Sequence, residues 1–117
     1  MLFRSCHARA ATAAETDWVR IAALYAELVA VQPSPVVELN RAVAVGMAEG
    51  PAAALPIVER LMQDPRLAHY HWLPSVRGDL LARLGRHAEA RAEFERAAAM
   101  THNERERTLL RERAAGA

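Results

Sequence analysis

Four polar residues interrupt two apolar stretches that are predicted to be helices: Asn40 and Arg41 in one, Arg77 and Asp79 in the other. Guanidinium and carboxylate groups form strong, charge-assisted hydrogen bonds, so these side chains could bind a segment of a partner protein. Alternatively, they bond one another or backbone carbonyls and fix the packing of the helices. The sequence leaves both interpretations open.

Five histidines are the residues best suited to hold a metal ion. His69 and His71 form the one close pair, whereas Cys6 is remote from them in sequence and His87 and His102 fall beside predicted helix ends. Zinc sites take at least three protein ligands, and no His-Glu-x-x-His pattern occurs. We therefore expect no metal site and no cofactor.

Catalytic machinery is the next possibility, because carboxylate pairs can act as general acids and bases. Glu89 with Glu93 and Glu104 with Glu106 lie among arginines, a pattern typical of solvated helix faces with ion pairs. The sequence contains no glycine-rich phosphate loop and no nucleophile elbow. We expect the protein not to be an enzyme, and a small hydrolase is the least supported alternative.

The charge balance bears on nucleic-acid binding. Fifteen basic and fourteen acidic residues give a formal net charge of +1, without the basic excess that a grip on phosphates requires. Near the end of the chain, Arg105, Arg107, Arg111 and Arg113 alternate with glutamates, which favours ion pairing along a helix. We expect no direct DNA binding by this chain.

The single cysteine rules out an intrachain disulfide and fits a reducing compartment. No apolar run reaches the roughly 20 residues that span a bilayer, and the first residues lack the apolar core of a signal peptide. The sequence therefore predicts a cytoplasmic protein without membrane contact.

The elements that position these residues are predicted to be helices. With 117 residues, 52% of them hydrophobic and only 5% aromatic, the chain has the length of one domain and the composition of an all-α protein. Pro and Gly separate the apolar-periodic stretches. The expected helices run from Thr16 or Asp17 to Pro33, Ser34-Pro35 to Gly50, Pro51 to Asp64, Leu73-Pro74 to Gly85, about His87 to Met100, and from Asn103 onward.

Each expected helix carries an apolar face that should point inward. The last helix is mainly polar and should act as a cap, with Asn103 and Glu106 forming a capping box at its start. The inward residues are predicted to be Trp18, Ile21, Leu24, Tyr25 and Leu28; Val36, Leu39, Val43 and Met47; Ala54, Leu55, Val58 and Leu61; Val76, Leu80, Leu81 and Leu84; Ala90, Phe94 and Ala97; and Leu109 and Leu110.

A repeat is visible in the second helix of each expected hairpin. The equivalent positions lie 33 and then 36 residues apart, close to the roughly 34-residue period of tetratricopeptide repeats. This spacing predicts antiparallel helical hairpins stacked as a short tetratricopeptide-like array, whose first helices line a concave surface. The three sets of equivalent residues are Ile21, Ala54 and Ala90; Tyr25, Val58 and Phe94; and Leu28, Leu61 and Ala97.

Longer stretches carry a family resemblance. These stretches are CHARA at 6–10, PSPVVELNRAVAV at 33–45, HWLPSVRGDLLARLGR at 71–86, HAEARAEFERA at 87–97 and NERER at 103–107, and from the first to the last they span almost the whole chain. They resemble the C-terminal extension of a group of bacterial extracytoplasmic-function RNA polymerase sigma factors. The resemblance implies a regulatory or protein-interaction domain of a transcription-initiation protein.

The same resemblance implies that the chain is a fragment, because the promoter-reading and polymerase-binding domains of that family precede this extension. Its partners would be its own sigma domains, RNA polymerase or a regulator. Residues 1–5 depart from the family pattern and are expected to be a non-native start, with 6–117 forming a single helical-repeat domain. The alternative is a stand-alone tetratricopeptide scaffold that binds a peptide or partner protein.

Overall fold

The computed structural model describes the backbone of residues 2–116 and the side chains of residues 17–116. The expectations about residues 1–5 and Cys6 concern side chains outside the described ones. All regular elements in the described part are helical, which confirms the all-α prediction. They are α1 (Leu2–Val31), α2 (Pro35–Glu49), α3 (Pro51–Leu61), the short 3₁₀ helix η1 (Pro65–Leu67), α4 (Trp72–Arg83), α5 (His87–Met100) and α6 (Glu104–Gly116).

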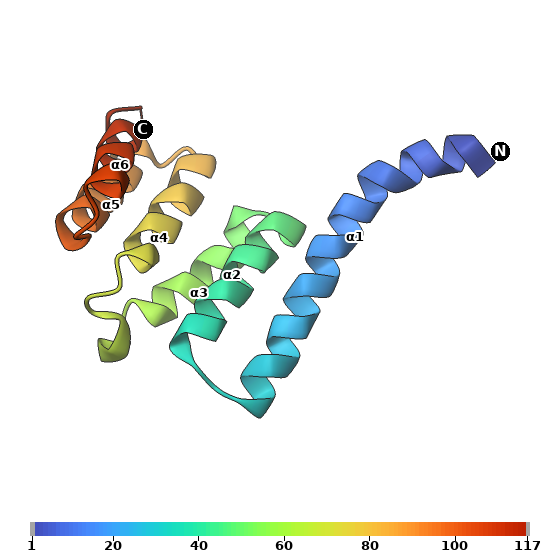
Figure 1. Cartoon of the computed structure of the whole chain (residues 1–117), viewed down its shortest axis with the longest axis horizontal. Coiled ribbons are helices and arrows are strands. Elements are labelled where there is room, and N and C mark those ends of the chain that lie inside the picture. Colours follow the sequence, from blue (N-terminus) through green and yellow to red (C-terminus); the bar gives the residue numbers. More distant parts are fainter. Residues whose placement is uncertain (1, 117) are drawn as a thin grey trace.

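Consecutive helices pack against each other as antiparallel neighbours, from α1 on α2 through to α5 on α6. Figure 1 shows this row, with α1 at one edge and α5 and α6 at the other. The principal extents of 52 × 36 × 24 Å reflect the elongated arrangement. Among the described residues, no helix is both long and apolar enough to cross a membrane.

The helix ends follow the predicted punctuation. Ser34 has extended backbone angles and is followed by Pro35 in the first turn of α2. Gly50 and Gly85 end α2 and the α4 region with φ angles of 99° and 80°, in the left-handed region where a side chain would be strained. Pro51 then begins α3. Proline suits this position because the N–H that it lacks would have had no hydrogen-bond partner within the helix.

The predicted start of the first helix was wrong. The sequence indicated a cap at Thr16 or Asp17, but α1 is already helical from Leu2 and passes through both residues without a break. The segment before Thr16 is rich in alanine, the residue with the highest intrinsic helix propensity. This local propensity outweighs the preference of Thr and Asp for a cap position.

The inward faces of α3 and α5 match the predictions most closely. Phe94, Leu81 and Val58 are the largest fully buried side chains among the described residues. Phe94 packs on Gly78 of α4, where a Cβ atom would come within 2.8 Å of the Phe94 ring. The buried residues of the two helices are Ala54, Ile57, Val58, Leu61, Ala90, Glu93, Phe94, Ala97 and Ala98.

On α2 the prediction selected the wrong side of the helix. Val36, Val43 and Met47 were expected to point inward but are exposed, and of the four predicted residues only Leu39 is buried. Small residues take the inner positions instead: a Cβ on Gly46 would lie 3.3 Å from side-chain atoms of α3 and α4. Close helix approach at this contact therefore decides which side of α2 faces the core. The buried residues of α2 are Leu39, Ala42, Ala44, Val45 and Gly46.

Other predicted core residues are also more open than expected. Leu84 at the end of α4 and Leu109 on α6 are exposed, although Leu110 beside Leu109 is buried as predicted. On α1, Leu24 and Leu28 are exposed as well. The residues predicted to face inward on α1, which packs chiefly on α2, are thus covered on one side only.

Candidate functional site

A stripe of residues on α4 stands just outside the buried face of that helix. Trp72, Val76, Asp79 and Arg83 follow one another at steps of four, three and four residues, so they share one side of the helix. The Trp72 side chain is 47% exposed, whereas Leu73 beside it is buried. An exposed tryptophan on a regular helix is the first indication of a contact surface.

Two adjoining hollows lie along this stripe. One, of about 280 Å³, has Val43 and Met47 of α2 on one side and Trp72 and Val76 of α4 on the other. The other, of about 180 Å³, lies between α4 and α6 and includes Leu109. Trp72, Ser75 and Arg113 line both hollows. We refer to these residues of α2, α4 and α6 together as the groove.

Charged residues of α4 and α6 pair with each other beside the apolar residues of the groove. Arg113 of α6 donates a hydrogen bond from Nη2 to Oδ1 of Asp79, at 2.6 Å. Its guanidinium also lies 4.5 Å from the centre of the Phe94 ring, a cation–π distance. Arg83 approaches the other oxygen of Asp79 at 3.9 Å. Asp79 therefore contacts two arginines of the larger hollow, and one of them, Arg113, also lines the smaller hollow.

Arg83 also ties α4 to α2. Its Nη2 atom donates to the backbone oxygen of Gly46 at 3.2 Å, at the residue where a Cβ atom would lie 3.3 Å from Leu80 of α4. This contact supplies a hydrogen-bond donor to a backbone carbonyl near the end of α2. The contact adds a hydrogen bond between two of the groove's three helices.

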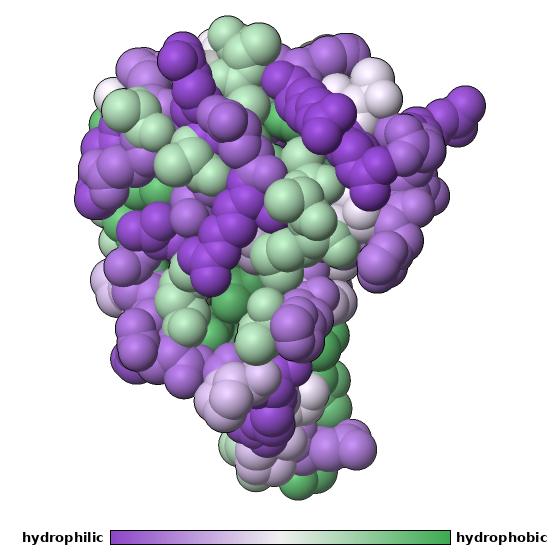
Figure 2. Space-filling model, turned by 90° about the vertical axis from the view of Figure 1, so that its left-hand side faces the viewer, coloured by the Kyte–Doolittle hydropathy of each residue, from purple (hydrophilic) through white to green (hydrophobic). Residues whose placement is uncertain are grey.

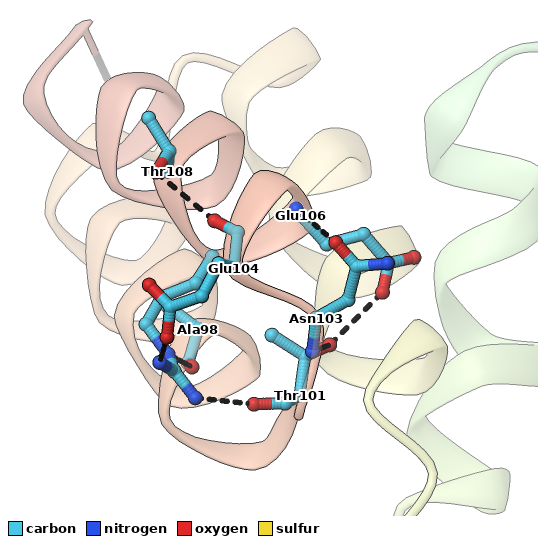
Figure 3. A network of polar contacts seen from close by, with 7 residues as sticks. Ala98, Thr101, Asn103, Glu104, Glu106 and Thr108 are labelled. Carbon is cyan, nitrogen blue, oxygen red and sulfur yellow. Dashed lines mark hydrogen bonds and ion pairs between the residues drawn. The ribbon is translucent and has the colours of Figure 1, made fainter.

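The third helix, α6, is held by a polar network at its start (Figure 3). The backbone N–H of Glu106 donates to Oδ1 of Asn103 at 3.0 Å, which confirms the predicted N-cap. The reciprocal half of the capping box passes through Thr101, whose hydroxyl accepts from the Asn103 N–H and donates to the Glu106 carboxylate. This relay replaces the direct bond from Asn103 N–H to Glu106.

Arg107 adds three contacts to this network. Its side chain donates to the backbone oxygens of Ala98, at 3.2 Å, and Thr101, at 2.7 Å, and it also pairs with Glu104. These carbonyls belong to the end of α5, so one guanidinium joins the end of α5 to the start of α6. The network sets the direction of α6 and hence the place of its groove residues.

The four residues singled out from the sequence do not form one cluster. Asp79 lines the groove. Asn40 is exposed on α2, three and seven residues before Val43 and Met47, on the same side of that helix. Arg41 pairs with Glu38 one turn earlier, with 2.5 Å between Nε and Oε1. Only Asp79 is therefore placed in the hollows.

Arg77 points away from Asp79, toward α3 and α5. Its Nε atom donates to Glu59 at 2.5 Å, and Nη1 lies 3.5 Å from Glu93. Burial lowers the pKa of the guanidinium, but the hydrogen bond and charge of Glu59, with the charge of Glu93, leave the pKa raised overall. Arg77 remains charged and links three helices, which fits the structural alternative for this residue.

Glu93 is a buried charge that the sequence reading placed on a solvated face. It is 6% exposed and sits between Arg77, at 3.5 Å, and Arg96, at 3.7 Å. Its Oε2 atom has no hydrogen-bond partner among the described residues. The signal available in the sequence was its position one residue before Phe94, next to the buried stripe of α5.

Sequence reasoning missed the groove because it assigned apolar residues to the core. Val43, Met47 and Leu109 were predicted to be buried, and Trp72 received no role. A usable signal was the width of the apolar face: α2 has apolar residues at more positions than one packing stripe needs. Surplus apolar residues beside a packed face are candidates for a contact surface.

The histidines show no metal-binding arrangement in the described region, where no group of three or more His, Cys, Asp or Glu side chains could hold an ion. His71 instead approaches Glu106 across the groove's end, with Nε2 3.4 Å from Oε2. Its ring lies beside that of Trp72, with the ring centres 4.8 Å apart. His71 thus helps to place the tryptophan.

The chain is similar to an uncharacterized protein of Rhizobium meliloti (strain 1021), with 50% identity over 105 residues. The match covers 90% of this chain but 24% of the relative, so the chain spans about a quarter of that protein's length. No protein-family model matches the chain. No solved structure matches it either.

Proposed function

We propose that this chain is the C-terminal protein-interaction region of a bacterial extracytoplasmic-function sigma factor, and that it acts in transcription initiation through its groove. In this proposal, α2 with α3 and α4 with α5 are tetratricopeptide-like hairpins and α6 is the cap. The partner is a protein segment supplied by the sigma factor's own domains, by RNA polymerase or by a regulator.

The observation that carries the proposal is the exposed apolar surface of the groove. Met47 and Trp72 are each close to half exposed and Val43 is 37% exposed, although the same two helices bury Leu39, Leu73 and Leu80. Apolar side chains gathered in a hollow and bordered by charges are typical of surfaces that bind other proteins. A partner segment would cover these side chains and release the water over them.

The charges suggest how a partner would be oriented. Arg113 is already held by Asp79 and by the Phe94 ring, so its guanidinium loses little freedom when it binds a carbonyl or carboxylate. Trp72, at the junction of the hollows, is the residue type that most often dominates binding energy at interfaces. We expect Trp72 to supply most of the binding energy and Arg113 to fix the position of the partner segment along the groove.

Two further observations support the sigma-factor assignment. The stretches at 33–45 and 71–86, which carry the resemblance, contain most of α2 and all of α4, the two helices that form the larger hollow. The Rhizobium relative is about four times as long as its matching segment, so that protein has room for additional domains. A region of a longer sigma factor is the proposal that fits both.

The proposal is tested in the longer reading frame, by assaying promoter-directed transcription in vitro. Trp72→Ala in that protein should lower transcription roughly thirtyfold, the effect of losing an interface residue that contributes about 2 kcal/mol. The control is Arg60→Ala on α3, an exposed residue outside both hollows. Circular dichroism melts of both variants show whether the fold is intact.

Unchanged transcription by a folded Trp72→Ala protein would refute the assigned role of the groove. A longer reading frame without sigma domains would instead favour the stand-alone scaffold. As a separate check on partner class, the isolated chain should give no sequence-specific gel shift with duplex DNA at physiological salt, because its net charge is only +1.

A further inference from the structure

The exposed face of α1 is the second surface without a partner in the described structure. By the register of the repeat, α1, α3 and α5 occupy the same place in successive units, with equivalent residues 33 and then 36 positions apart. The equivalent sets are Ile21, Ala54 and Ala90; Leu24, Ile57 and Glu93; Tyr25, Val58 and Phe94; and Leu28, Leu61 and Ala97.

The residues at these positions are buried on α3 and α5 but largely exposed on α1. On α3 and α5 none of the eight residues is more than 7% exposed. On α1, Leu24 is 55% and Leu28 40% exposed, and Ile21 and Tyr25 are only half-buried. The repeat therefore identifies a covered position in α3 and α5 that is uncovered in α1.

In the other two hairpins the equivalent helix has a packing neighbour both before and after it in the chain. The α3 helix packs on α2 and α4, and the α5 helix packs on α4 and α6, whereas α1 packs chiefly on α2, which follows it. Figure 1 shows α1 at the edge of the row with no helix on its outer side. What is missing is one antiparallel helix, in the position that α2 and α4 hold against α3 and α5.

The two existing hairpins also show what that helix must carry. Phe94 rests on Gly78, and a Cβ there would come within 2.8 Å of its ring. In the preceding hairpin the equivalent pair, again 36 residues earlier, is Val58 with Ala42, both fully buried. Because Tyr25 is aromatic like Phe94, the missing helix needs a glycine opposite it.

A second copy of the chain does not meet this requirement. The α1 segment from residue 17 to 31 contains no glycine, so two α1 faces would bring Tyr25, Leu24 and Leu28 against their own equivalents. The glycine faces of α2 and α4 are already covered within the chain. The opposite end of the molecule is mainly hydrophilic, as Figure 2 shows, and does not offer an apolar helix face for head-to-tail packing.

We infer that residues 17–31 of α1 form the docking site for one amphipathic, glycine-bearing helix, tethered in the same longer polypeptide. The tether follows from size: a face one helix wide offers much less than the roughly 800 Å² per partner that stable complexes bury. Within one polypeptide the same contact forms at a high effective concentration. This part of the inference rests on the proposal that the chain belongs to a longer protein.

The test appends a probe helix to the full chain. Residues 71–86, which contain α4 and Gly78, are fused ahead of residue 1 through a flexible Gly/Ser linker of about 16 residues. Such a linker averages about 22 Å and so spans the roughly 24 Å of α1 that precede residue 17. The matched control is the same fusion with Gly78→Leu in the appended helix only.

The readout is the maleimide labelling rate of a thiol introduced by Leu24→Cys, in a Cys6→Ser background. We expect labelling to slow roughly tenfold or more in the glycine fusion and to stay at the rate of the unfused chain in the leucine fusion. The free peptide 71–86, at a concentration equal to that of the chain, should protect the thiol only weakly.

Equal labelling in both fusions and in the unfused chain would overturn the inference. Protection by the free peptide as strong as in the fusion would overturn the need for a tether. A dimer of the unfused chain with a protected thiol would assign the face to a second copy. The labelling result does not depend on the transcription assay, so failure of this inference and failure of the proposed function can be distinguished.

Discussion

The two ends of the helical row differ in how they are finished. At the C-terminal end, α5 is covered on both sides, and α6 is held by Asn103, Thr101 and Arg107 and presents a mainly hydrophilic outer surface. At the N-terminal edge, α1 is covered by α2 on one side and exposes Leu24 and Leu28 on the other.

In the repeat array proposed above, α6 would be a terminal helix and α1 an interior one. Repeat arrays need an outer helix with a polar face, because a stacked apolar face left open is unfavourable in water. The α6 helix meets that description and α1 does not. The comparison can be tested by substitutions that should have large effects near α5 and small effects at the equivalent places on α1 and α2.

The largest effect is expected at the aromatic residue between α4 and α5. Phe94→Ala removes a fully buried ring and should cost about 3–5 kcal/mol of the free energy of unfolding, a large part of the total for a domain of this size. Tyr25→Ala, at the equivalent position of half-buried α1, should cost less than half as much. Urea unfolding measures both, and equal costs would refute the difference between the two ends.

The next effect concerns the glycine beneath that ring. Gly78→Leu should destabilise the chain by about 1–3 kcal/mol or more, because the new side chain occupies the space of Phe94. Gly46→Ala is the control: its Cβ meets neighbours at 3.3 Å, and alanine regains about 1 kcal/mol of helix propensity. In thermal melts, the melting temperature of Gly78→Leu should be well below that of Gly46→Ala. The reverse order would contradict the packing of Phe94 on Gly78.

A smaller effect is expected from the cap of α6. Asn103→Ala removes the acceptor for the Glu106 N–H and should cost about 1 kcal/mol, with faster amide exchange in the first turn of α6. Asn40→Ala, in the interior of α2 and exposed, should be neutral or slightly stabilising. If the two substitutions gave the same loss of stability, the network in Figure 3 would not be what holds α6.

The smallest effect is expected from the ion pair across the groove. Asp79 and Arg113 have side chains 42% and 49% exposed, so a double-mutant cycle with alanine should give a coupling energy of about 0.2–1 kcal/mol that falls with added salt. In either single variant, the free energy of partner binding that is lost should be larger than this coupling energy. A coupling energy well above that range would make the pair structural.

Local signals in the sequence were enough to define most of the helices. The Ser34-Pro35 start, the glycines at 50 and 85 and the Asn103 cap depend on backbone preferences of single residues, which act wherever those residues stand. The inward-facing residues of α3 and α5 could also be predicted from the sequence. Each of these helices is covered on two sides, so most of its large apolar residues are buried.

The tertiary structure decided which side of α2 faces the core and which charged residues share a surface. Arg77 and Asp79 are two positions apart, so a helix sends them in different directions, to Glu59 and Glu93 on one side and to Arg113 on the other. On α2 the close approach at Gly46 turned Val43 and Met47 outward. Periodicity defines an apolar face, but the distance of closest approach between helices selects which part of a wide face is buried, and that distance depends on the partner helix.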